Sequence, residues 1–329
     1  MTTSYYKPSG RLTFNFFLLY ILLMVVSIPV LSYVYIYLVH YIPFIYANFF
    51  ISVFCGMGTG YLIGIAVKKG RARNPAVVVV MTLAATCVLY YVQWCVYIPL
   101  VASEVYGFTM TFGERFFETL YYFMYPGDVY EAAMIINEFG AWTLNDAEIT
   151  GGFLLFIWIA EFIIIAVCAI IMSNSQATNP YSEENDDWYV PDSTVDIDII
   201  PDFDTVKEDL EAGRYADFIQ HAVKGCSGGD DYQRLTFFRS PEDTSSEPYY
   251  MNIDQSKVEN TGRKKNKGKI KAKNLLKYII IDSQSAKEII AGAATSAAAA
   301  YDREEDPDET DPDTYEPAKT DPDPTETNE

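Results

Sequence analysis

The sequence is poor in the side chains that most often serve nucleophilic and metal-assisted catalysis. It has two histidines, His40 and His221, and five cysteines in 329 residues. No C-x-x-C pair occurs, so a zinc site is not indicated. The positions of the basic residues, described below, predict that the two histidines lie on opposite sides of a membrane. A mechanism that needs both of them is therefore not favoured. The sequence therefore favours a non-enzymatic protein and indicates no cofactor and no metal.

Basic residues are also scarce. Lysine and arginine number 24 against 44 acids, which gives a net charge of −20. A chain of this charge repels nucleic acid, so we expect no nucleic-acid partner. Half of the residues are nevertheless hydrophobic. The two properties are compatible because the apolar residues cluster before position 173 and most acids follow it.

The apolar half contains four long segments, at 12–39, 44–67, 76–100 and 151–172. Each can cross about 30 Å of hydrocarbon at about 1.5 Å per residue. The first is too long for the core of a signal peptide, and we expect it to kink at Pro29. The predicted fold is a multi-pass α-helical membrane protein with four transmembrane helices, a C-terminal cytosolic α+β domain and a disordered acidic tail.

Basic residues flank these segments unevenly. Two lie in the N-terminal segment 1–11 and four crowd the short loop 68–75, whereas the loop 101–150 has only Arg115 against eight acids. Cytoplasmic loops are enriched in lysine and arginine. We therefore expect both termini in the cytosol, the loop 101–150 outside, and an integral protein of the plasma (inner) membrane.

Small residues recur at every fourth position of the second segment. They are Ser52, Gly56, Gly60 and Gly64, and they share one helical face. In lipid, such a face lets another helix approach closely. The pattern predicts packing against another span of the same chain. A homo-oligomer interface and a pore-lining face are the alternatives.

Glu161 lies in the middle of the fourth segment. An ionised carboxylate is costly at that depth, so it needs a partner or a function. The third segment carries a polar face that includes Thr86, Tyr90 and Gln93. We expect a protonated Glu161 that is hydrogen-bonded to Tyr90 or Gln93. The functional alternative is a proton or cation relay, which would make the protein a small transporter or channel component.

The loop 101–150 contains two helical patterns. Residues 115–125 are rich in aromatic side chains, and Pro126-Gly127-Asp128 followed by an acid is typical of a helix start. Gly140 fits the end of that helix. We expect two short amphipathic helices that cap the bundle or lie on the outer leaflet.

The cytosolic half begins with an acidic segment, 173–204, which we interpret as a solvated linker with one short strand near 195–199. A domain at 205–300 follows. We expect Thr205 with Glu208, and later Ser285 with Glu288, to cap its helices.

Three apolar segments of that domain have strand character, at 232–239, 249–258 and 270–281, and we expect an antiparallel meander. The tail 301–329 repeats D-P-D and lacks the apolar residues that a core needs.

A run of basic residues between the last two strands is unusual in so acidic a chain. Its members are Arg263, Lys264, Lys265, Lys267, Lys269, Lys271, Lys273 and Lys277. A solvated hairpin, docking on anionic lipid headgroups and pairing with the acidic tail all fit this pattern.

The composition as a whole favours a membrane-anchored scaffold, sensor or accessory protein. Its partners would be the lipid bilayer, a protein that binds the cytosolic domain, or a second copy of the chain. A transporter or channel component that uses Glu161 is the alternative.

Overall fold

The computed structural model describes residues 4–42, 44–140, 143–144, 147–225, 231–242, 247–259 and 269–304. The chain divides into two compact units. The first comprises Met1–Pro191 with Phe238–Tyr250, and the second comprises Asp192–Phe237 with Met251–Glu329. Cys226, Trp142, residues 263–267 of the basic run and the tail from 305 onward lie outside the described residues.

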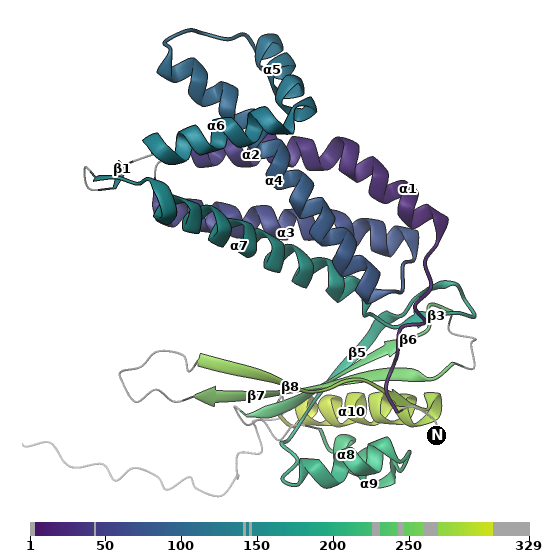
Figure 1. Ribbon diagram of the computed structural model, residues 1–329. Coiled ribbons are helices and arrows are strands. Elements are labelled where there is room, and N and C mark those ends of the chain that lie inside the picture. Colours follow the sequence, from purple (N-terminus) through teal and green to yellow (C-terminus); the bar gives the residue numbers. More distant parts are fainter. Residues whose placement is uncertain are drawn as a thin grey trace, which may run out of the picture. The chain divides into compact units, whose positions relative to one another are not determined.

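Four long helical segments form the first unit (Figure 1). The first is α1 (Phe14–Leu22), a π-helical turn at Leu23–Ser27 and α2 (Ile28–Tyr41). The others are α3 (Ile45–Gly70), α4 (Pro75–Val105) and α7 (Gly151–Ala177). All four are long and apolar enough to cross a membrane.

Pro29 alters the first segment through this π-helical turn. Proline has no N–H to donate to the preceding turn, so a regular α-helix loses a hydrogen bond there. The N–H of Ile28 donates to the carbonyl of Leu23, five residues earlier, so the irregularity lies just before the proline.

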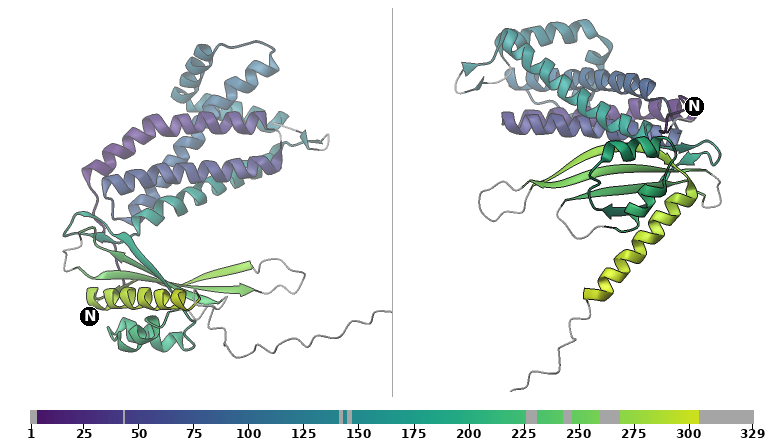
Figure 2. Two further views of the ribbon diagram at one scale, coloured as in Figure 1. Left: turned by 180° about the vertical axis from the view of Figure 1, so that it is seen from behind. Right: turned by 90° about the horizontal axis from the view of Figure 1, so that it is seen from below.

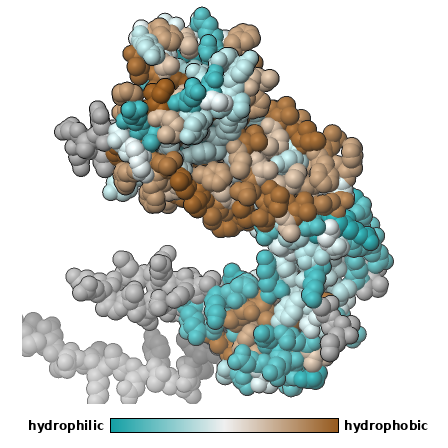
Figure 3. All heavy atoms as spheres, in the orientation of Figure 1, coloured by the Kyte–Doolittle hydropathy of each residue, from teal (hydrophilic) through white to brown (hydrophobic). Residues whose placement is uncertain are grey.

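Large apolar side chains cover the outside of these helices. Phe54 of α3 is 67% exposed, and Ile171 of α7 and Leu18 of α1 are also exposed. In Figure 3 apolar residues dominate the visible face of the helices. Such a surface is costly in water and favourable in lipid, which is the pattern of an integral membrane protein.

Helices α3 and α7 run side by side and pack most extensively of all helix pairs (Figure 1, Figure 2). Between α4 and α7 the chain forms α5 (Phe112–Met124), α6 (Pro126–Phe139) and a small antiparallel pair, β1 (Thr143–Leu144) and β2 (Ala147–Glu148). Two helices were expected in this loop.

The starts of α5 and α6 differ from the expectation. Thr111 and Glu114 form a reciprocal capping box at α5, where each accepts a hydrogen bond from the other's backbone N–H. Helix α6 begins at Pro126, where the missing N–H costs nothing. Asp128 does not cap it but accepts a hydrogen bond from the Tyr121 hydroxyl at 2.6 Å.

The segment 173–204 contains more structure than the solvated linker that its composition predicts. Helix α7 continues to Ala177, and a hairpin of β3 (Tyr181–Ser182) and β4 (Asp187–Trp188) follows. Strand β5 (Val190–Ile197) is longer than expected and begins earlier. Aromatic residues in the hairpin, which the count of acids conceals, supply its buried side chains.

The sheet has four strands in the order β5-β6-β7-β8, so each strand pairs with its neighbour in sequence, as in a meander. The later strands are β6 (Tyr232–Arg239), β7 (Tyr249–Glu259) and β8 (Lys269–Ile281). Three helices complete the second unit: α8 (Phe203–Glu211), α9 (Ala216–Ala222) and α10 (Ser283–Glu304).

Aspartates cap α8 and α10, in place of Thr205 and Ser285, which were expected from the sequence. Asp202 accepts from the N–H of Thr205 at α8, and Asp282 accepts from the N–H of Ser285 at α10. Aspartate is among the best N-cap residues, and each lies three positions before the N–H it binds. Val223 packs tightly against Gly292 of α10, which has no side chain to keep the neighbouring segment away.

Candidate functional site

Glu161 of α7 is bonded by tyrosines from two other helices. The hydroxyl of Tyr35, from α2, donates to Oε1. The hydroxyl of Tyr90, from α4, lies 3.4 Å from Oε2 and 2.9 Å from the carbonyl oxygen of Trp158. The carboxyl group is therefore held between three spans, which lowers the cost of placing it in an apolar bundle.

A chain of hydroxyl groups extends from Glu161 to a fourth helix. The Tyr35 hydroxyl lies 3.1 Å from the hydroxyl of Ser52 in α3. Ser52 in turn donates to the carbonyl of Asn48 at 2.9 Å. The chain thus ends on a main-chain carbonyl at Asn48, and on another at Trp158. A carbonyl oxygen accepts a hydrogen bond but passes no proton onward, so the chain of hydroxyl groups does not extend beyond these two carbonyls.

Gln93 does not bond to Glu161. It lies one helical turn beyond Tyr90, about 4.5 Å further along α4, and the longer tyrosine side chain makes the contact. Gln93 is buried, and its amide oxygen has no hydrogen-bond partner among the described residues. Thr86 is also buried, and its hydroxyl donates to the carbonyl of Thr82 in its own helix.

The small-residue face of α3 serves two purposes. Ser52 belongs to the hydroxyl chain, whereas Gly56 and Gly60 lie against the backbone of α7. A Cβ atom added at Gly56 would lie 2.6 Å from the carbonyl oxygen of Ile165. Gly64 has no neighbouring atom within 4 Å of an added Cβ. The close approach of α3 and α7 therefore depends on two of the four residues.

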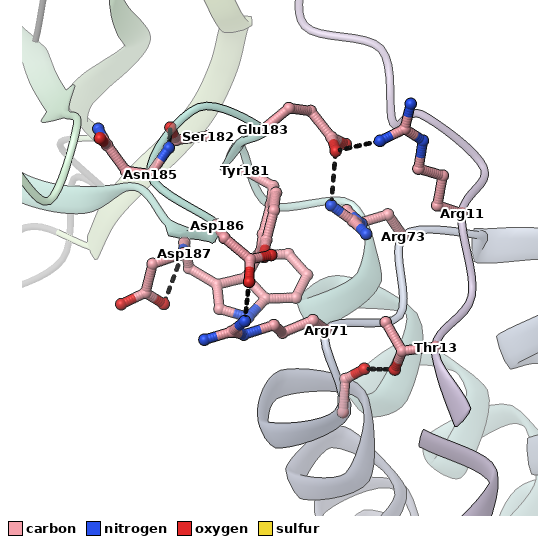
Figure 4. A network of polar contacts seen from close by, with 12 residues as sticks. Arg11, Thr13, Arg71, Arg73, Tyr181, Ser182, Glu183, Asn185, Asp186 and Asp187 are labelled. Atoms are coloured by element: carbon pink, nitrogen blue, oxygen red, sulfur yellow. Dashed lines mark hydrogen bonds and ion pairs between the residues drawn. The ribbon is translucent and has the colours of Figure 1, made fainter. Parts of the chain in front are cut away.

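A second polar site lies at the end of the spans where α3 and α7 terminate. There the hairpin β3-β4 meets the loop between α3 and α4 (Figure 4). Glu183 is its centre: Arg73 binds one of its oxygens at 2.7 Å, and Arg11 binds the same oxygen at 3.1 Å. The Arg73 side chain is only 6% exposed, and its guanidinium group lies over the Tyr181 ring at 4.2 Å. An anionic and an aromatic partner both stabilise this buried cation, whose Nε has no hydrogen-bond partner among the described residues.

Asp186 forms the second ion pair of the hairpin, with Arg71. It also accepts a hydrogen bond from Tyr181 at 2.5 Å. This bond, together with the nearby guanidinium groups of Arg71 and Arg73, lowers the pKa of Asp186. Burial, followed by the bond to Asp186, raises the pKa of Tyr181. Arg71 has a left-handed backbone (φ 54°), which ends α3 and turns the chain toward the hairpin.

Main-chain and aromatic contacts complete this site. The indole N–H of Trp188 donates to the carbonyl of Lys68 in the last turn of α3, at 2.9 Å. The N–H of Gly10 donates to the carbonyl of Arg73, and the N–H of Arg73 donates to the carbonyl of Arg11. The N-terminal segment, the helix ends and the hairpin therefore form one connected network.

The same unit includes the segment 238–250, on which the hairpin also packs. Asn185 donates to the Ser240 hydroxyl at 2.6 Å, and the Tyr189 hydroxyl donates to the carbonyl of Pro248. The ring of Tyr250 contacts Tyr189 and Tyr6 edge-on. These contacts hold the ends of β6 and β7 in the first unit.

The basic run expected as a site is only partly described. Lys269, Lys271, Lys273 and Lys277 belong to β8. Lys273 and Lys277 are exposed, and the ammonium group of Lys277 lies 5.0 Å from the Tyr278 ring. In the described ranges, no group of three histidine, cysteine or acidic side chains is arranged to hold a metal ion.

Sequence reasoning missed Tyr35, Glu183 and Asp186. Tyr35 stands in an aromatic-rich span in which single tyrosines carry little signal. For the two acids a signal was available, because an acidic stretch follows the last span and a basic loop precedes the third. Opposite charges at the same end of a bundle favour pairing.

Comparisons of the chain with protein-family models, curated proteins and solved structures give no match. Its function is therefore inferred from geometry alone.

Proposed function

We propose that the protein is a non-catalytic, membrane-anchored scaffold, sensor or accessory protein that holds its sheet domain at the cytosolic face of the plasma (inner) membrane. The four spans would place both termini in the cytosol. The observation that carries the proposal is the Arg73–Glu183 network, because it fixes the hairpin to the helix ends. Fixing of this kind suits a module whose position relative to the bilayer matters.

The distribution of charge supports the orientation. All basic residues of the network, together with Lys68 and Lys69, lie at one end of the spans. The loop at the other end has one basic residue and eight acids. Under the positive-inside rule the network end is cytosolic.

The orientation is tested by cysteine labelling of intact cells with a membrane-impermeant maleimide. Cysteine introduced as Glu114→Cys should react, and cysteine introduced as Thr320→Cys should react only after the membrane is permeabilised. The native cysteines provide the background, measured in the unmodified chain. The reverse pattern would place the sheet domain outside and refute the proposal.

The fixing of the hairpin is tested by hydrogen exchange on the full chain in nanodiscs. Arg73→Met removes the charge and keeps the length of the side chain, so exchange in 181–188 and at residues 10–13 should accelerate. Arg73→Lys should restore part of the protection. Arg234→Met is the matched control, because it breaks an exposed pair with Asp196 in the second unit. Unchanged hairpin exchange in Arg73→Met would show that the network does not hold the hairpin.

A transporter or channel component is the second candidate, and the hydroxyl chain from Ser52 through Tyr35 to Glu161 is the observation that favours it. Liposomes that contain the protein and a pH-sensitive dye distinguish the two functions. The scaffold proposal expects no proton flux above that of empty liposomes. A flux that disappears in Glu161→Gln, with stability unchanged, would establish the relay instead.

A further inference from the structure

The helices α5 and α6 form a hairpin whose turn points back along the spans. The hydroxyl of Tyr91, in the middle of α4, lies 3.0 Å from the carbonyl oxygens of Tyr122 and Phe123 at the end of α5. Val129, near the start of α6, packs against Ile98 of α4. In Figure 1 and in the reverse view of Figure 2, the hairpin lies beside the spans rather than only beyond their ends.

The depth of this turn can be estimated from α7. Tyr91, which contacts the end of α5, follows Tyr90 in α4, and Tyr90 bonds to the carbonyl of Trp158. Trp158 lies seven residues after the start of α7 at Gly151. Seven residues correspond to about 10 Å along a helix. At the same end of the bundle, His40 lies 2.8 Å from Glu104, so the ends of α2 and α4 are level there.

The spans are longer than the hydrocarbon that they cross. Helix α7 has 27 residues, or about 40 Å, against a hydrocarbon core of about 30 Å. If the bundle is centred, about 5 Å of helix projects at each end. A turn about 10 Å from the end then lies about 5 Å inside the acyl-chain region.

The side chains near the turn suit this environment. Residues 119–127 include no charged residue. Met124 is 70% exposed and Tyr125 is 55% exposed. The nearest acid after the turn, Asp128, accepts the hydrogen bond from Tyr121. The exposed glutamates lie further from the turn, with Glu114 in the first turn of α5 and Glu118 in its middle.

We propose that the α5–α6 hairpin is inserted in the bilayer, with residues 122–127 in the acyl chains of the leaflet at the Val105 end of α4. Its occupant is lipid. Exposed apolar side chains occur on the hairpin, as at Met124 and Tyr125, and on the spans, as at Phe54, so lipid can cover both. The inference rests on the spans crossing a membrane, as the proposed function also does.

The test is spin labelling of the full chain in liposomes, with collision rates measured for oxygen and for a water-soluble nickel chelate. Oxygen concentrates in hydrocarbon and the chelate in water. A label at Met124→Cys should collide often with oxygen and rarely with the chelate, and a label at Tyr125→Cys should behave in the same way. Phe54→Cys on α3 is the lipid-facing control, and Glu114→Cys is the control for water.

Each other outcome has a definite meaning. Frequent collision of label 124 with the chelate would show a cap in water and overturn the proposal. Rare collision with both reagents would show that protein, such as a second copy, covers the turn, and this would overturn it too. Frequent chelate collision at position 54 would show that the bundle is not in lipid, which refutes the proposed function rather than the hairpin alone.

Discussion

The close approach of α3 and α7 depends on Gly56 and Gly60, and single methyl groups test it. An alanine Cβ at Gly60 would meet the carbonyl oxygen of Ala169 and would lie 2.7 Å from the Cβ of Met172. At Gly56 the nearest atom, the carbonyl oxygen of Ile165, would lie 2.6 Å away. These three atoms of α7 are main-chain oxygens or a Cβ atom. Such atoms cannot move away by a change of rotamer, so the helices must separate.

The separation needed can be estimated. Ordinary contact with a Cβ begins near 3.4 Å. At Gly56 the helices must therefore move apart by about 0.8 Å, the difference between 3.4 and 2.6 Å. Overpacking of this kind typically costs about 1–3 kcal/mol. We expect Gly60→Ala and Gly56→Ala each to destabilise the protein by that amount.

Gly64→Ala is the matched control, because it lies on the same face of α3 and its added Cβ meets nothing within 4 Å. It should leave stability unchanged or raise it slightly, since alanine favours a helix over glycine. The assay is unfolding of the detergent-solubilised full chain, followed by circular dichroism during titration with a denaturing detergent. Equal unfolding midpoints for the alanine variants at 60 and 64 would refute the close packing of α3 on α7.

Two further perturbations address the polar sites. Glu161→Gln keeps the shape of the side chain and a carbonyl oxygen that accepts from Tyr35, so the same titration should give a nearly unchanged midpoint. Glu161→Leu removes the acceptor for Tyr35 and should cost about 1 kcal/mol. Equal midpoints for the two variants would contradict the bonding. Because the pKa of Asp186 is lowered in the folded protein, its contribution to stability is present above the unfolded value of about 4 and is lost as pH falls through the folded value. The melting temperature of the wild type should therefore exceed that of Asp186→Asn at pH 6, and this difference in melting temperature should shrink as the pH falls below about 4. A difference that stays constant from pH 6 to pH 3 would show that the ionised carboxylate of Asp186 is not its cause.

The membrane half shows what sequence patterns predict well. Long apolar segments predict spanning helices because length and hydropathy are local properties, and four such helices are present. The small-residue face of α3 predicts close packing for the same reason. It does not identify α7 as the partner or separate Gly60 from Gly64, because the crossing point of two helices depends on the whole bundle.

The polar contacts show where local patterns fail. Glu161 is conspicuous in sequence, but Tyr35 comes from a span 126 residues away, and only the assembled bundle, in which α2 packs on α3 and α4, brings the two together. The hairpin β3-β4 was missed because its acids suggest a solvated segment. Its fold depends on Trp188 and Tyr181, whose rings contact each other and which also have partners at the helix ends.

The strength of the link between the helices and the hairpin depends on which contacts are shielded from water. Exposed ion pairs contribute about 0–1 kcal/mol each, so the pairs of Arg11 and Arg71, both largely exposed, add little on their own. Arg73 is different, because it is buried and contacts Glu183 and the Tyr181 ring together. Removal of Glu183 would leave the buried Arg73 charge without its anionic partner, which costs far more than an exposed pair is worth. Removal of Arg73 would leave a carboxylate that is 40% exposed and still contacts Arg11. The Arg73–Glu183 pair should therefore contribute more to this link than the exposed pairs do, and the indole bond from Trp188 to Lys68 holds the hairpin beside it.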